Sequence, residues 1–204
     1  MISGATLLAF TGASLALAIT PGPDMMLCAS RAATQGRWVA CLTLLGVCTG
    51  LMIHALLAGL GLSQLLIASP SALTAVRWIG AGYLLWIAFR TLTAPPPTDA
   101  VAAPRARSGA QAFRVGLLTN LFNPKVILFV LALYPQFVTP GAAPVVGQML
   151  LLGFINVIVG FAVNAVVIEA SARLGRGLGG GGRFAGLGRW LMASVFGALA
   201  ARLA

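Results

Sequence analysis

Residues 19–31 read Ile-Thr-Pro-Gly-Pro-Asp-Met-Met-Leu-Cys-Ala-Ser-Arg, and the start of this stretch interrupts an apolar run that begins at Leu7. Each proline removes an amide donor and its ring clashes with the preceding helical turn, so a helix must break here. A bilayer tolerates such a break only where the freed backbone groups are buried in protein or line a wet cavity. Asp24, one of three acidic residues in the chain, stands at the break. An ionisable group inside a membrane is a candidate for function.

The composition indicates an integral membrane protein. The chain has 204 residues, of which 59% are hydrophobic and 8% charged, and its mean hydropathy is +0.98. Soluble domains carry about 25% charged residues, and spanning helices need runs of about 20 apolar residues such as recur here. The net charge is +10, but the basic residues lie between the apolar runs rather than on a soluble module, which argues against nucleic-acid binding.

The predicted fold is all-α: a polytopic bundle with about six spans, built as a 3+3 inverted repeat. The spans are predicted at 5–28, 38–62, 71–90, 114–138, 145–170 and 187–203. The Ala- and Pro-rich segment 91–111 is predicted to be a flexible cytoplasmic connector between half-repeats 1–90 and 112–204.

The arginines predict the orientation in the membrane. Loops one, three and five hold ten arginines and the other side holds Arg77 and Arg202, so the odd loops should be cytoplasmic and both termini outside. The ten are Arg31, Arg37, Arg90, Arg105, Arg107, Arg114, Arg173, Arg176, Arg183 and Arg189.

A second break mirrors the first. Because each half has three spans, the two halves run in opposite directions, and the first span of each half contains a proline break. One break is Thr20 to Asp24 and the other is Asn120 to Lys125. Interrupted spans at corresponding positions of two halves point to the central site of a transporter. The breaks also carry opposite charges, on Asp24 and Lys125.

Four-residue spacing places Gly46, Gly50, His54 and Ala58 on one face of the second span. Small residues on such a face let another helix approach closely. His54, the single histidine, should therefore point into the bundle. A structural hydrogen bond across helices and a role with protons or substrate both remain open for it.

The fifth span has Asn156, Gly160 and Asn164 at the same spacing. Amides in hydrocarbon need partners, so this face should look inward, either as polar contacts between helices or as the lining of a cavity. Near the end of the span, Glu169 is predicted to pair with Arg173 at i+4.

Motifs for enzyme chemistry are not recognisable in the sequence. No G-x-x-x-x-G-K-[ST] occurs, and the G-x-G-x-x-G match at Gly175 has no preceding strand. The one histidine, three cysteines and three carboxylates show no catalytic or metal-ligand spacing. We therefore expect no catalytic residues, no metal site and no cofactor.

Four motifs resemble the LysE/RhtB family of amino-acid exporters over nearly the whole chain. They are Ile19-Thr20-Pro21-Gly22-Pro23-Asp24, Gly46-x3-Gly50-x3-His54, Gly80-Ala81-Gly82-Tyr83-Leu84-Leu85-Trp86, and Phe113-x2-Gly116-Leu117-Leu118-Thr119-Asn120-Leu121-x-Asn123-Pro124-Lys125. The resemblance implies one LysE-type transporter domain over 1–204, in a bacterial inner membrane, exporting amino acids or derivatives by proton antiport. It leaves the cargo undetermined, and exposed small-residue faces leave a homodimer open.

An amino acid carries an ammonium and a carboxylate, so a site with one group of each sign can engage both. Our hypothesis is that Asp24 takes the ammonium, or a proton after the cargo leaves, while Lys125 and amides freed by the breaks take the carboxylate. A permanent Asp24–Lys125 ion pair that only positions the breaks is the alternative. The candidate binding residues are Thr20, Pro21, Gly22, Pro23, Asp24, His54, Asn120, Asn123, Pro124 and Lys125, with Asn156 and Asn164 as candidate cavity lining.

Two other functions compete with amino-acid export. A membrane-embedded enzyme would need a nucleophile–base or metal constellation. An exporter of metal cations or other small solutes on a related fold would favour several carboxylates or rings of carbonyls along its path.

Overall fold

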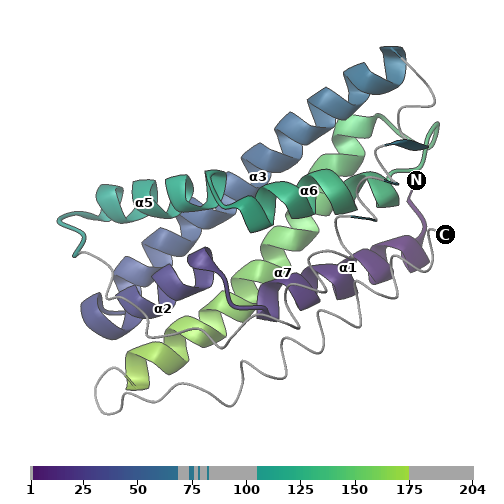
Figure 1. Ribbon diagram of the computed structural model, residues 1–204. Coiled ribbons are helices and arrows are strands. Elements are labelled where there is room, and N and C mark those ends of the chain that lie inside the picture. The colour runs from purple at the N-terminus through teal and green to yellow at the C-terminus, as the bar shows by residue number, and fades with distance from the viewer. Residues whose placement is uncertain (1, 69–73, 76–77, 79–81, 83–104, 175–204) are drawn as a thin grey trace.

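The computed structural model describes residues 2–68, 74, 75, 78, 82 and 105–174. Over these residues the chain folds into the helices of Figure 1, which confirms the predicted all-α class. The helices are α1 (Gly4–Ile19), α2 (Pro23–Gln35), α3 (Arg37–Ala68), α5 (Gly109–Leu121), α6 (Pro124–Phe137) and α7 (Val145–Leu174). Most of the predicted span 71–90, all of the span 187–203 and most of the connector 91–111 lie outside the described residues.

The lengths of these helices fit a polytopic membrane protein. Segments Arg37–Gln64 of α3 and Val145–Arg173 of α7 are each long and apolar enough to cross a membrane. The pair α1 and α2 bends by 55° and the pair α5 and α6 by 54°, and each bent pair passes the same test as one broken span. A broken span followed by a long helix therefore occurs twice with almost the same bend. The predicted inverted relation of the two halves stays a prediction.

Two predicted boundaries are wrong because helices continue past the apolar runs. The first span was expected to end at residue 28, but α2 continues to Gln35, so Arg31 lies on a helix and is buried rather than in a loop. At the other boundary α5 begins at Gly109, where Ser108 Oγ accepts a hydrogen bond from Gln111 N. Arg114 is therefore an exposed helical residue.

Helix α3 packs along α5 and α7, and α2 packs against both long helices (Figure 1). Glycines allow the close approach of α3 and α5. A Cβ atom on Gly46 would overlap the carbonyl of Phe113, and one on Gly116 would overlap the carbonyl of Thr43. The small-residue face predicted from the spacing of Gly46 and Gly50 is thus a helix interface.

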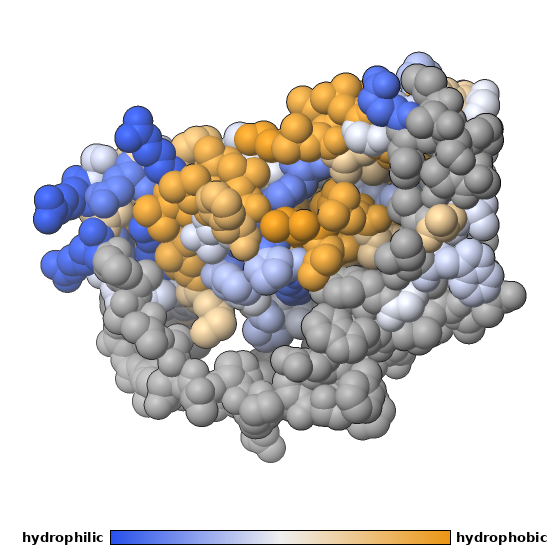
Figure 2. Space-filling model, turned by 45° about the horizontal axis from the view of Figure 1, so that its top comes forward, coloured by the Kyte–Doolittle hydropathy of each residue, from blue (hydrophilic) through white to orange (hydrophobic). Residues whose placement is uncertain are grey.

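Aromatic rings fill the core between α1 and α6. The ring of Phe10 meets Tyr134 and Phe137 edge-on, with centroids 5.1 and 5.2 Å apart, a geometry that aromatic pairs prefer. The outer surface is also apolar, with Leu8 and Phe122 more than 70% exposed. Figure 2 shows hydrophobic side chains over much of one face, as contact with lipid requires, while strongly hydrophilic ones gather mainly at the end where α5 begins.

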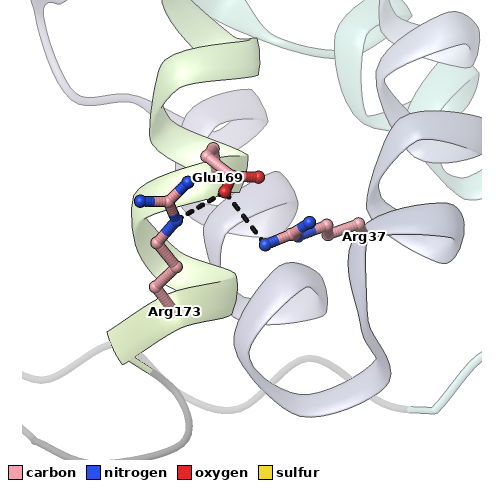
Figure 3. A network of polar contacts seen from close by, with 3 residues as sticks. All are labelled: Arg37, Glu169 and Arg173. Atoms are coloured by element: carbon pink, nitrogen blue, oxygen red, sulfur yellow. Dashed lines mark hydrogen bonds and ion pairs between the residues drawn. The ribbon is translucent and has the colours of Figure 1, made fainter.

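Polar contacts join the helix ends at this hydrophilic end. Glu169 Oε1 on α7 accepts from Arg173 Nε at 2.6 Å and from Arg37 Nη2 of α3 at 2.9 Å (Figure 3). The predicted Glu169–Arg173 pair is therefore confirmed, with Arg37 as a further partner. Gln35 at the end of α2 accepts a hydrogen bond from Ala106 N at 2.7 Å. Residues assigned to loops one, three and five thus lie at one end of the molecule.

The close packing of α3 against α5 can be tested by adding a single methyl group at the interface. Gly116→Ala should lower the stability of the protein in detergent by about 1–3 kcal/mol, because overpacking forces two backbones apart. Gly12→Ala is the matched control, since a Cβ there meets nothing within 4 Å and alanine favours a helix over glycine. Thermal unfolding followed by size-exclusion chromatography measures both. Equal stability of the two variants would contradict the described interface.

Candidate functional site

The two helix breaks have the same construction. α1 ends at Ile19, Thr20 and Gly22 are extended, and Pro23 occupies the first turn of α2. At the other break α5 ends at Leu121 and Pro124 opens α6. Proline suits the first turn of a helix because the amide it lacks would have no partner there. Pro21, Pro23 and Pro124 therefore shape the breaks through the backbone.

Lys125 connects the second break to the first. Its Nζ donates to Thr20 O at 2.7 Å and to Leu17 O at 3.0 Å. These carbonyls belong to the last turn of α1, whose acceptors the break leaves without helical partners. Gly22 makes the approach possible, because a Cβ there would lie 3.3 Å from both Cδ and Nζ of Lys125. The two breaks, which the sequence analysis assigned to one central site, are therefore in direct contact.

Asp24 is held by an amide from the other break. Asn120 Nδ2 donates to Asp24 Oδ2 at 2.7 Å, and Asn120 is fully buried. The second carboxylate oxygen, Oδ1, is buried and accepts no hydrogen bond. Asn120 is positioned in turn by Gly50 of α3, where a Cβ would come within 2.6 Å of Asn120 Oδ1. Asp24 thus keeps one acceptor free in a buried place.

Asp24 and Lys125 do not form an ion pair. The ion pairs among the described residues are those of Glu169 with Arg37 and Arg173. In this structure each group has neutral hydrogen-bond partners instead, so the ion-pair alternative stays a hypothesis that this arrangement does not favour. Both charges nevertheless line one cavity.

This cavity lies between the breaks and has a volume of about 60 Å³. It offers room for about two water molecules. Six helices contribute to its wall, and α3 supplies an apolar side with Leu44, Val47, Cys48 and Leu51. The polar residues at the wall are Thr20, Asp24, Asn120, Asn123, Lys125, Asn156 and Asn164.

The amide face of α7 forms one side of the cavity, with Gly160 between the two asparagines. Asn156 Nδ2 donates to Tyr134 OH at 3.1 Å, so this amide also makes a contact between helices. Asn164 Nδ2 donates to Gly160 O at 2.9 Å, which leaves its buried Oδ1 without a partner. Asn123 accepts from Lys125 N and caps α6.

His54 lies outside this cavity. Its Nε2 is 3.3 Å from the backbone oxygen of Asn120. The ring lines a second, mainly apolar cavity of about 350 Å³ between α3, α6 and α7, together with Ala58, Ile127 and Met149. Asn120 therefore connects His54 to Asp24, because its main chain contacts the histidine and its side chain holds the carboxylate.

Arg31 is the buried polar residue that the sequence analysis missed, because it was assigned to a loop. It is 2% exposed and contacts α3 and α5. Its distance of seven residues from Asp24 was the available signal, since i and i+7 share a helical face. Among the described residues no group of three His, Cys, Asp or Glu side chains could hold a metal ion.

Comparison with known proteins agrees with this architecture. Residues 15–204 match the LysE type translocator family. The chain belongs to this family of transporters. No solved structure matches it.

Named relatives of this LysE type translocator include three efflux proteins. The homoserine/homoserine lactone efflux protein of Salmonella typhimurium is 33% identical over 150 residues, which cover 74% of this chain and 72% of the relative. The threonine efflux protein of Escherichia coli K12 is 36% identical over 126 residues, 59% of this chain and 60% of the relative. The cysteine/O-acetylserine efflux protein of Salmonella typhimurium is 32% identical over 152 residues, 72% and 75% of the two chains.

The contact between Asn120 and Gly50 can be tested with a double-mutant cycle. Gly50→Ala should cost about 1–3 kcal/mol of stability, because the methyl group overlaps the Asn120 amide. In an Asn120→Ala background the same change should cost less, since Oδ1 and Cγ are gone. Thermal unfolding of the four proteins in detergent gives the coupling free energy. Strictly additive effects would show that the two residues do not touch.

Proposed function

We propose that this protein exports amino acids or their close derivatives across a bacterial inner membrane by proton antiport, with the cargo bound between the two helix breaks. The observation that carries the proposal is the cavity at the breaks. It has a carboxylate with an unpaired oxygen and a lysine ammonium on its wall, and the two are not paired with each other.

The free hydrogen-bonding capacity of the two groups matches a zwitterion. Asp24 Oδ1 would accept from the ammonium of the cargo. Lys125 has three donors and uses two on backbone carbonyls, so one remains for a carboxylate. The amides at the start of α2 add to the carboxylate side, because Gly22 gives that helix no side-chain cap and a helix N-terminus favours negative charge.

The size of the cavity bears on how transport proceeds. Room for about two waters is less than an amino acid needs, so the site must widen when cargo binds. The breaks supply the hinges, because extended residues join helices that bend by 55° and 54°. Alternating access would then be a movement of α1–α2 and α5–α6 relative to the long helices.

Proton coupling rests on Asp24. The carboxylate can bind either the ammonium of the cargo or a proton, so the two compete for one group. Such competition is what an antiporter needs, since the carrier returns with the proton after the cargo has left. The sequence has no ATP-binding loop of the Walker type, which favours an ion gradient as the source of energy.

The hydrophilic end is proposed to face the cytoplasm. Five described arginines lie near helix ends there: Arg37 begins α3, Arg105 and Arg107 precede α5, Arg114 lies in the second turn of α5, and Arg173 lies in the last turn of α7. The contacts of Arg37 with Glu169 and of Gln35 with Ala106 join these helix ends. The positive-inside rule then gives the predicted orientation, with odd loops in the cytoplasm.

Metal-cation export is the rival proposal, and the contacts of Lys125 argue against it. A cation path would use carbonyls freed by the breaks. Here the carbonyls of Leu17 and Thr20 bind a lysine ammonium, which repels other cations.

An uptake assay tests the function directly. Inverted membrane vesicles containing this protein should accumulate at least one of homoserine, threonine or cysteine when a proton gradient is imposed, and a protonophore should abolish the uptake. Vesicles without the protein are the control. Uptake of divalent cations in place of these amino acids would overturn the proposal.

The charged residues give the second test of function. Asp24→Asn and Lys125→Met should each reduce export by about 10- to 100-fold, because a hydrogen bond to a charged group contributes about 1.5–3 kcal/mol. The double variant should fold and remain inactive, since both cargo contacts are lost. Chromatographic stability in detergent separates folding from function. Near wild-type export by the folded double variant would contradict the zwitterion site.

His54 is expected to position Asn120. His54→Gln can place an amide where Nε2 lies and should keep most of the export activity. His54→Leu should reduce it, because Asn120 O then keeps the amide of Asn123 but loses its contact with α3. Both are measured in the vesicle assay, with protein amounts quantified by immunoblotting. A folded His54→Gln protein that transports without proton coupling would assign the histidine a role in coupling instead.

A further inference from the structure

Among the residues that the structure describes, Arg31 is a buried cation without an anionic partner. It is 2% exposed, and its Nη1 donates to Thr43 Oγ1 at 2.8 Å and to Ala112 O at 3.2 Å. Its Nε is buried and makes no hydrogen bond. The described ion pairs do not include it, and a guanidinium stays protonated in proteins. Within the described part of the chain, the partners of this positive charge are therefore neutral oxygens.

The position of Arg31 places this charge between the cavity and the hydrophilic end. Arg31 follows Asp24 by seven residues on α2, so the two share a helical face at a separation of roughly 10 Å along the axis. Its partner Thr43 precedes Leu44, which lines the cavity. Cargo that enters from the hydrophilic end approaches the cavity through the field of this charge.

The other charges near the cavity cancel. Asp24 and Lys125 contribute one charge of each sign at its wall. Cys28, which lies one helical turn before Arg31 on α2, is a free thiol, and the α5 contact of Arg31 is a backbone carbonyl. Counting the described residues, Arg31 therefore gives this part of the proposed transport path a net positive charge.

We propose that Arg31 selects cargo by charge: it excludes amino acids with a cationic side chain and admits those with no net charge. This inference rests on the proposed function, because it names the class of cargo for the same cavity. At roughly 10 Å and an effective dielectric constant of about 20, one unit charge changes the relative affinity for a cation by roughly tenfold.

A purely structural role would not require the charge. The contacts to Thr43 and Ala112 join α2 to α3 and α5, and a neutral amide could make similar hydrogen bonds. Burying a cation without a counter-charge is expensive. The proposed selection of cargo explains why a charged arginine, rather than a neutral amide, occupies this buried position.

Two cargoes of equal length measure this selection. Homoserine ends in a hydroxyl group, and 2,4-diaminobutyrate has an ammonium in its place. Proteoliposomes containing the full chain are loaded with both, and the ratio of their export rates under a proton gradient is recorded. Because both rates come from the same vesicles, the ratio does not depend on how much protein has folded.

Thr43→Asp neutralises the charge without removing Arg31, since it puts a carboxylate where Oγ1 accepts from Nη1. It should raise the ratio of diaminobutyrate to homoserine export by roughly tenfold. Thr43→Asn has the same shape without the charge and should keep the wild-type ratio. Arg31→Gln should raise the ratio as Thr43→Asp does, and Arg31→Lys should not.

The outcomes separate the inference from the function on which it rests. A wild-type protein that exports homoserine, with the same ratio in Thr43→Asp and Thr43→Asn, would overturn the role of Arg31 alone. Equal shifts in Thr43→Asp and Thr43→Asn would also overturn it, by showing an effect of shape. Failure of the wild type to move any amino acid in the uptake assay would overturn the proposed function, and the inference with it.

Discussion

The hydrogen bonds from Lys125 to the last turn of α1 are the contact on which the site depends. A break in a membrane helix frees carbonyl groups that lipid cannot satisfy. Here the ammonium at the start of α6 satisfies those of Leu17 and Thr20. The same contact brings the two bent helices together and fixes the place of the cavity. Asn120 makes the reciprocal connection, from the end of α5 to Asp24 at the start of α2.

The two breaks are alike in backbone but opposite in their polar groups. Both bend by almost the same angle and both have proline in the first turn of the following helix. At α6 the side chain of Asn123 caps the helix, whereas at α2 no side chain does so. The start of α2, with its uncapped amides and the unpaired oxygen of Asp24, therefore has more unused hydrogen-bonding capacity than the start of α6.

Much of this arrangement could be predicted from the sequence, because prolines and glycines act locally. The breaks, the long apolar helices and the packing face around Gly46 follow from spacing alone. The partners of Asp24 and Lys125 could not be predicted in this way. A bend of 55° rotates every side chain beyond it, and no local pattern specifies that angle. Arg31 was missed for a related reason, since apolarity ends before α2 does and the remaining helix is held by tertiary packing.

The exchange of partners between the halves has a consequence for how the protein is made. Lys125 follows its acceptors by 105 and 108 residues, and Asn120 follows Asp24 by 96. During synthesis the first broken span therefore enters the bilayer long before the groups that satisfy it have left the ribosome. Until then the carbonyls of Leu17 and Thr20 and the carboxylate of Asp24 depend on water, lipid headgroups or the insertion machinery. Synthesis of the second half thus supplies the groups that stabilise the first broken span in the membrane.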